Sequence, residues 1–87
     1  MATVWIPSLM RDLTAGQAEV VVEGRTLGAV IEALERAYPG VKVRLVRNGQ
    51  LDPTLRALVD GRAALLGLGQ PVGEQSEIQI VPAFAGG

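Results

Sequence analysis

Apolar and polar positions alternate along several short stretches of the chain. The stretches are residues 3–6, 17–23, 54–59, 62–66 and 77–81. Each is rich in aliphatic or β-branched side chains and is bounded by Pro, Gly or Asp, a pattern typical of β-strands. The pattern predicts five strands. The first two form a hairpin with a rather long connection, and Asp60-Gly61 makes a tight turn between the third and the fourth.

One longer stretch between the second and third strands follows a helical period instead. Its recurring apolar positions are Leu27, Val30, Ile31, Leu34 and Tyr38. Glu32, Glu35 and Arg36 occupy the opposite face, which predicts an amphipathic helix. Thr26 is placed to cap its N-terminus, and the Pro-Gly pair at 39–40 ends it.

Residues 41–51 fit two interpretations. Val41, Val43 and Leu45 alternate as they would in a strand, whereas Val41, Leu45 and Val46 also suit a short helical turn. We favour the helical turn, followed by a chain reversal at Asn48-Gly49. The glycines and the proline of residues 67–73 mark a loop before the last strand.

A single helix covers only one face of a sheet, so the order of elements predicts a two-layer α+β domain. A hairpin, a crossing helix and a returning hairpin fit the ubiquitin-like β-grasp arrangement. That arrangement is a mixed sheet of four or five strands with the first and last strands parallel at its centre. We expect a single domain over residues 1–81 and a flexible C-terminal tail over residues 82–87.

Composition narrows the function. The chain has 87 residues, 48% of them hydrophobic, and a net charge of −1, with no basic stripe that would favour nucleic acid. No apolar run reaches the length of a membrane span, and no secretion signal stands at the N-terminus. Cysteine is absent, which suits the cytoplasm.

The missing residue types also bear on catalysis. Without Cys or His, the chain has no thiolate nucleophile, no His base and no His-ligated metal. Gly24 and Gly28 lack the spacing and the Lys of a phosphate-binding loop. We therefore expect no catalytic residues, no metal and no bound cofactor, and interpret the chain as a protein on which enzymes act.

The end of the chain carries the most specific chemistry. Gly86-Gly87 follows a core strand, and two successive glycines allow close backbone approach in a narrow enzyme site. Pro82 restricts the start of the tail, and Phe84 is a candidate anchor for a partner pocket. The terminal carboxylate of Gly87 is then a group that ATP can activate. A Gly-Gly end can also be accidental.

The ending Ile80-Val81-Pro82-Ala83-Phe84-Ala85-Gly86-Gly87 resembles that of the ubiquitin-like sulfur carriers. These include the small subunit of molybdopterin synthase, the thiamine-pathway carrier and the carrier that feeds cysteine synthesis. Ile6-Pro7-Ser8-Leu9-Met10-Arg11, Thr14-Ala15-Gly16-Gln17 and Thr26-Leu27-Gly28-Ala29-Val30-Ile31 resemble the cysteine-pathway branch. Gly73-Glu74-Gln75-Ser76 departs from the Asp-Gly-Asp type of turn that many relatives carry before the last strand.

The resemblance implies a reaction sequence at Gly87. An adenylyltransferase of the ubiquitin-activating type would adenylate the carboxylate with ATP, and a sulfurtransferase would convert the adenylate to a thiocarboxylate. In the cysteine branch the sulfur would attack an aminoacrylate on a pyridoxal-phosphate synthase, and a metal-dependent peptidase would release the product. The other branches would deliver sulfur to a pterin or to thiazole. The tail that threads into the partners comprises Pro82, Ala83, Phe84, Ala85 and Gly86.

Two other functions remain open. A protein modifier would be joined through Gly87 to lysines of target proteins, and a plain β-grasp binding module would not use its tail. Among other side chains, Trp5 fits the core and a partner-facing patch equally well. For Leu58, Leu65, Leu66 and Leu68 a core position is favoured over the alternative that some lie on the uncovered sheet face and dock a partner enzyme. Asp52 and Asp60 are interpreted as turn-forming residues.

Overall fold

A computed structural model of the chain describes residues 1–83; residues 84–87 lie outside the described part. The elements in chain order are β1 (Ala2–Trp5), the 3-10 helix η1 (Ser8–Thr14), β2 (Glu19–Val22), α1 (Leu27–Ala37), α2 (Val41–Leu45), β3 (Val46–Arg47), β4 (Gln50–Leu51), β5 (Leu55–Val59), β6 (Arg62–Ala63), the 3-10 helix η2 (Gly67–Gly69) and β7 (Glu77–Pro82).

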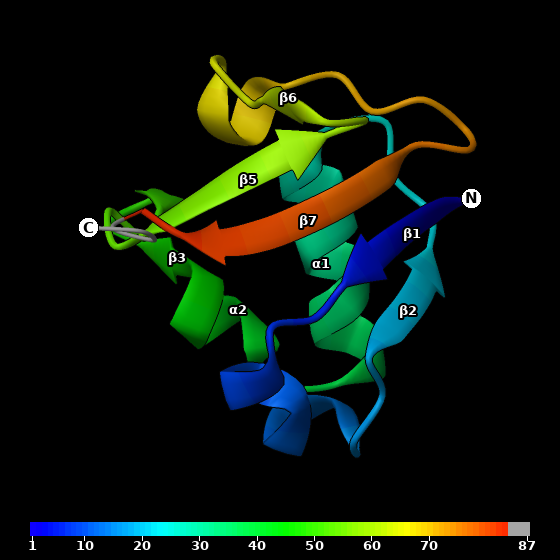
Figure 1. Cartoon of the computed structure of the whole chain (residues 1–87), viewed down its shortest axis with the longest axis vertical. Coiled ribbons are helices and arrows are strands. Elements are labelled where there is room, and N and C mark those ends of the chain that lie inside the picture. The colour runs from blue at the N-terminus through cyan, green and yellow to red at the C-terminus, as the bar shows by residue number, and fades with distance from the viewer. Residues whose placement is uncertain (84–87) are drawn as a thin grey trace.

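The main sheet has the strand order β2-β1-β7-β5-β6 (Figure 1). The first and last strands are parallel neighbours, with Thr3 opposite Glu77 and Trp5 opposite Gln79. All other pairs in this sheet are antiparallel. The α+β β-grasp architecture and the central position of the last strand are therefore confirmed.

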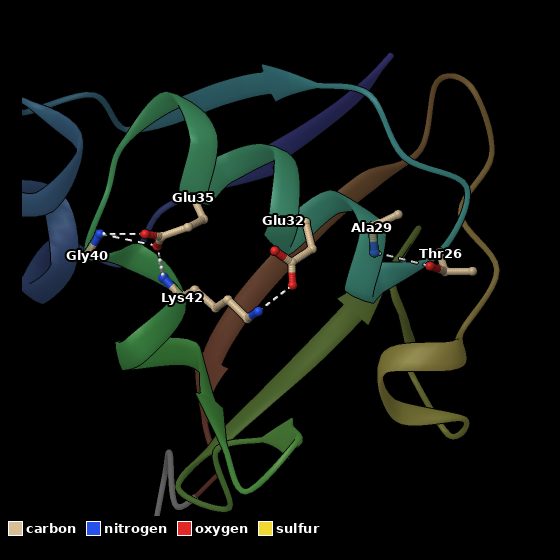
Figure 2. Close-up of polar contacts among 6 residues, drawn as sticks. All are labelled: Thr26, Ala29, Glu32, Glu35, Gly40 and Lys42. Carbon is tan, nitrogen blue, oxygen red and sulfur yellow. Dashed lines mark hydrogen bonds and ion pairs between the residues drawn. The ribbon is translucent and has the colours of Figure 1, made fainter.

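Helix α1 crosses one face of the sheet and forms the core with it (Figure 1). The side chains that are at most 2% exposed include Val4, Leu27, Val30, Ile31, Leu34 and Ile78. The helical stripe predicted from the sequence is thus the buried face of α1. Thr26 caps the helix as expected, because its Oγ1 accepts a hydrogen bond of 3.1 Å from the amide of Ala29 (Figure 2).

The ambiguous stretch 41–51 contains both kinds of structure. The favoured helical turn is α2, whose Val41 and Leu45 are buried. After it, β3 and β4 form a two-residue hairpin around Asn48 and Gly49, which have φ angles of 55° and 76°. Such left-handed angles at both central positions are those of the tight hairpin turns that Asn-Gly favours.

Glu35, predicted on the solvent face of α1, instead connects the two helices. Its carboxylate accepts hydrogen bonds from the amide of Gly40, at 3.1 and 3.2 Å, and from the amide of Lys42, at 2.8 Å (Figure 2). These donors lie at the start of α2, where helical amides have no partner within the helix. Glu32, one turn earlier on α1, forms an ion pair with the Lys42 side chain.

Several boundaries differ from the prediction. The long connection between β1 and β2 folds as η1 and buries Met10 and Thr14, which a loop interpretation misses. The fourth strand stops at Ala63, and Leu65 and Leu66 beyond it are 89% and 67% exposed, so the core position favoured for them is wrong. The strand expected over residues 77–81 extends to Pro82.

Candidate functional site

The last strand is held on both sides. β7 pairs with β1 in parallel and with β5 in antiparallel register, and its Ile78 and Ile80 are 0% and 5% exposed. A chain end attached to such a strand starts from a fixed point, whereas chain termini otherwise tend to be poorly ordered. The central strand therefore holds Pro82, its last residue, at a defined position at the end of the sheet.

At the end of β7, the chain is hydrogen-bonded to the turn that precedes β5. Pro82 lies opposite Leu55 of β5, and the amide of Ala83 donates a hydrogen bond of 2.9 Å to the carbonyl of Thr54. We call Pro82, Ala83 and Thr54 the root of the C-terminal arm. Among the residues predicted to thread into partner enzymes, Pro82 and Ala83 thus have defined positions at the end of the sheet.

Asp52 fixes the turn on which the root depends. Its Oδ1 accepts hydrogen bonds from the amide of Thr54, at 2.8 Å, and from the Thr54 hydroxyl, at 2.6 Å. These two bonds, the hydroxyl first, lower the pKa of the Asp52 carboxyl from its ordinary value. The interpretation of Asp52 as a turn-forming residue is confirmed. Its connection to the end of β7 was missed, because no local pattern relates residues 52 and 83.

A groove of about 360 Å³ adjoins the root. Its lining residues are Pro7, Leu9, Met10, Val43, Arg44, Arg47, Asp52, Thr54, Leu55 and Pro82. They come from the stretch around η1, from α2, and from the strands and turn that meet the root. We call this feature the root groove. Its lining combines apolar side chains with two arginines.

The outer face of the sheet carries Trp5, which is 38% exposed and donates a hydrogen bond of 3.0 Å from Nε1 to Oε1 of Glu77. Of the two roles considered for Trp5, this exposure at the surface fits a partner-facing patch better than a core position. Asp60, at the far end of the sheet, accepts hydrogen bonds from the Ser76 hydroxyl and the Glu77 amide. Asp60 is thus a turn residue, as expected.

The other predicted site residues fall outside the described part of the chain. Phe84, Ala85, Gly86 and the reactive Gly87 belong to residues 84–87. Within residues 1–83, no three His, Cys, Asp or Glu side chains gather where they could hold a metal ion. In the same residues, no helix is long and apolar enough to cross a membrane. Of the predicted site, the structure therefore describes the root and the residues around it.

Comparisons with known proteins agree with this geometry. The sulfur carrier protein CysO of Mycobacterium tuberculosis is 37% identical over 90 residues, which cover 98% of this chain and 97% of the relative. A chain of the crystal structure of the Amycolatopsis orientalis BexX/CysO complex superposes with a TM-score of 0.93 at 31% identity, with both chains fully covered. Small archaeal modifier protein 3 of Haloferax volcanii is 30% identical over 69 residues, 77% of this chain and 75% of the relative.

The family match extends beyond individual relatives. The model of the ThiS family matches residues 4–87, from the first strand through the two terminal glycines. The expected resemblance to ubiquitin-like sulfur carriers is thus confirmed over nearly the full sequence. This β-grasp chain belongs to the ThiS family.

Proposed function

We propose that this chain is a sulfur carrier protein that delivers sulfur for cysteine biosynthesis. The observation that carries the proposal is its 37% identity to the M. tuberculosis sulfur carrier protein CysO over 98% of the chain. The root supports it, because a central strand held on both sides gives the C-terminal arm a fixed origin at the end of the sheet. The chain is then a co-substrate, and its enzymatic chemistry belongs to its partners.

The proposed chemistry takes place at Gly87. A carboxylate oxygen attacks the α-phosphorus of ATP, and pyrophosphate leaves. A donor at the oxidation level of sulfide then attacks the acyl carbon, and AMP leaves. The product is a thiocarboxylate, whose sulfur is a nucleophile at neutral pH. ATP is bound by the activating partner, and the carrier itself holds no cofactor.

The proposed partners correspond to these steps. They are an adenylyltransferase of the ubiquitin-activating type, a sulfurtransferase, a sulfur-accepting synthase that uses pyridoxal phosphate, and a metal-dependent peptidase that releases the cysteine. The A. orientalis relative was solved in complex with BexX, which supports the proposal that the carrier acts through protein partners. Because the sequence of steps consumes ATP, we place it in the cytoplasm.

The test measures the intact mass of the purified chain in an extract of the source organism. With ATP, we expect a gain equal to the difference between one sulfur and one oxygen atom, and no gain without ATP. A variant lacking Gly86 and Gly87 should show no gain. With a synthase extract and its amino-acid substrate, a total gain of one cysteine residue over the unloaded chain identifies the cysteine branch. A native chain whose mass stays unchanged with ATP would refute the carrier function.

A protein modifier is the second candidate. The similarity to small archaeal modifier protein 3 of H. volcanii favours it specifically, since that relative is named for modification. The same incubation separates the two functions. Conjugates of high mass that contain the chain joined through Gly87 would support the modifier, whereas the sulfur-for-oxygen gain on the free chain supports the carrier.

A further inference from the structure

The root groove has exposed aliphatic side chains at its rim and apolar side chains of the core in its lining. Leu9 and Val43, which line it, are 85% and 78% exposed. Met10 and Leu55 in the same lining belong to the core or pack against it. Exposed aliphatic side chains next to apolar side chains of the core are typical of surfaces that bind another protein.

The charge of the groove is positive. Arg44 is exposed and has no carboxylate within ion-pair distance among residues 1–83. The Arg47 side chain is 64% exposed, and its Nε lies 4.0 Å from Oδ2 of Asp52, the outer limit of an ion pair. Among the described residues of the lining, Asp52 is the single acid, and its other oxygen is occupied by Thr54. Both arginines can therefore pair with carboxylates of a partner.

The position of the groove indicates which partner occupies it. Thr54 and Pro82 belong both to its lining and to the root of the arm. An enzyme that takes the C-terminus into its active site must lie against the root, so its surface also covers the adjoining groove. In contrast to the groove, the outer sheet face near Trp5 carries negative charge, because Glu19 and Glu77 flank that side chain.

We propose that the root groove is the docking surface for the enzyme that activates the C-terminus, and that the docking segment of this enzyme carries carboxylates beside an aliphatic side chain. The aliphatic side chain packs between Leu9 and Val43, and the carboxylates pair with Arg44 and Arg47. This inference rests on the proposed function. Attraction between the two charge patterns accelerates and orients the encounter, and the apolar contact holds it.

The test measures the initial rate of ATP-dependent sulfur gain by intact mass, in extract of the source organism, with the full chain as substrate. The variant is R44E/R47E. At limiting carrier concentration, we expect its rate to fall about tenfold or more, because like charges then face each other in the complex. At saturating carrier concentration, the rate should return to within about twofold of the native rate, since the groove provides binding and not chemistry.

The matched control is R25E/R36E. Arg25 and Arg36 are also exposed, and they line a different depression with Met1 and Glu74. This pair changes the net charge equally and should leave both rates unchanged. A second comparison tests the apolar contact: L9S/V43S should lower the rate at limiting concentration, whereas L65S, at a leucine 89% exposed outside the groove, should not. Thermal unfolding is measured for every variant to check that each is folded.

Ionic strength gives an independent readout. Raising the salt concentration from about 50 to about 300 mM should slow loading of the native chain at limiting concentration and affect R44E/R47E much less. Native-like loading of R44E/R47E, an equal loss in R25E/R36E, or a salt-independent native rate would overturn the groove proposal while leaving the carrier function in place. A native chain that gains no sulfur would overturn both.

Discussion

Gly24 stands at the entry to α1 with no room for a side chain. A Cβ there would lie 2.7 Å from both Cγ2 and the backbone nitrogen of Val30. We expect Gly24→Ala to lower the free energy of unfolding by about 1–3 kcal/mol, because the start of α1 must shift. Urea unfolding measures the change. Gly69→Ala is the control, since no atom of the described residues lies within 4 Å of the Cβ it would add, and equal losses in the two variants would contradict the crowding at Gly24.

Asp60 makes the stability of the protein depend on pH. The hydrogen bonds from the Glu77 amide and, second, from the Ser76 hydroxyl lower its pKa from the ordinary value of 3.8. A carboxyl whose folded pKa is lowered stabilises the fold when ionised. This contribution is fully present above pH 3.8 and is lost as the pH falls through the lower folded value.

The matching variant is Asp60→Asn, which keeps a residue that tolerates the observed φ of 52°. Urea unfolding at a series of pH values should show a shallower acid loss of stability for Asp60→Asn than for the native chain. The pH dependence of the free energy of unfolding that remains in Asp60→Asn includes the contribution of Asp52, whose pKa is also lowered. Identical slopes in the two proteins would show that the Asp60 contacts do not stabilise the ionised form.

The junction between α1 and α2 depends on Glu35. Its carboxylate satisfies the amides of Gly40 and Lys42, which begin α2. Glu35→Ala leaves these donors without their partner, so we expect a loss of about 1–3 kcal/mol in the free energy of unfolding. Glu32→Ala removes only the exposed ion pair with Lys42 and should cost at most about 1 kcal/mol. Chemical unfolding compares the two, and a larger loss for Glu32→Ala would contradict this assignment.

Elements with a strong period were predictable from the sequence, and elements that depend on distant contacts were not. The stripe from Leu27 to Tyr38 identified α1, and the alternation of residues 77–81 identified β7. The 3-10 helix η1 has no period of its own, and burial of Met10 and Thr14 in the folded chain stabilises it. Leu65 and Leu66 continue the apolar pattern of a strand, but β6 ends before them at the edge of the sheet.

The candidate site likewise contains parts that the sequence predicts and parts that only the fold reveals. The terminal glycines and Pro82 were visible as a motif, because their chemistry is local to a few successive residues. The root groove was not visible, since it combines Leu9, Val43 and Leu55 from three separate parts of the chain. Only the fold brings η1, α2 and β5 together beside Pro82.

Across the entire fold, the central position of β7 links the stability of the protein to the presentation of its C-terminus. β7 pairs with strands on both sides, whereas β6, at the edge, pairs with β5 alone among the strands of residues 1–83. Amide hydrogen exchange resolves such differences, because edge segments open locally while central strands open only with the global unfolding. We expect the amides of residues 78–81 to exchange with the global free energy of unfolding measured in urea, and those of β6 with a smaller one.

The physical reason is that opening β7 breaks its contacts with both β1 and β5 and exposes Ile78 and Ile80 to water. We therefore expect no partial opening that releases the strand while keeping the rest of the core. In the proposed function, an enzyme that holds the C-terminus would therefore act against the full stability of the domain, and the root would keep its position during the proposed reaction. Exchange of residues 78–81 at the same low free energy as β6 would show that the strand separates locally and that the sheet does not fix the root.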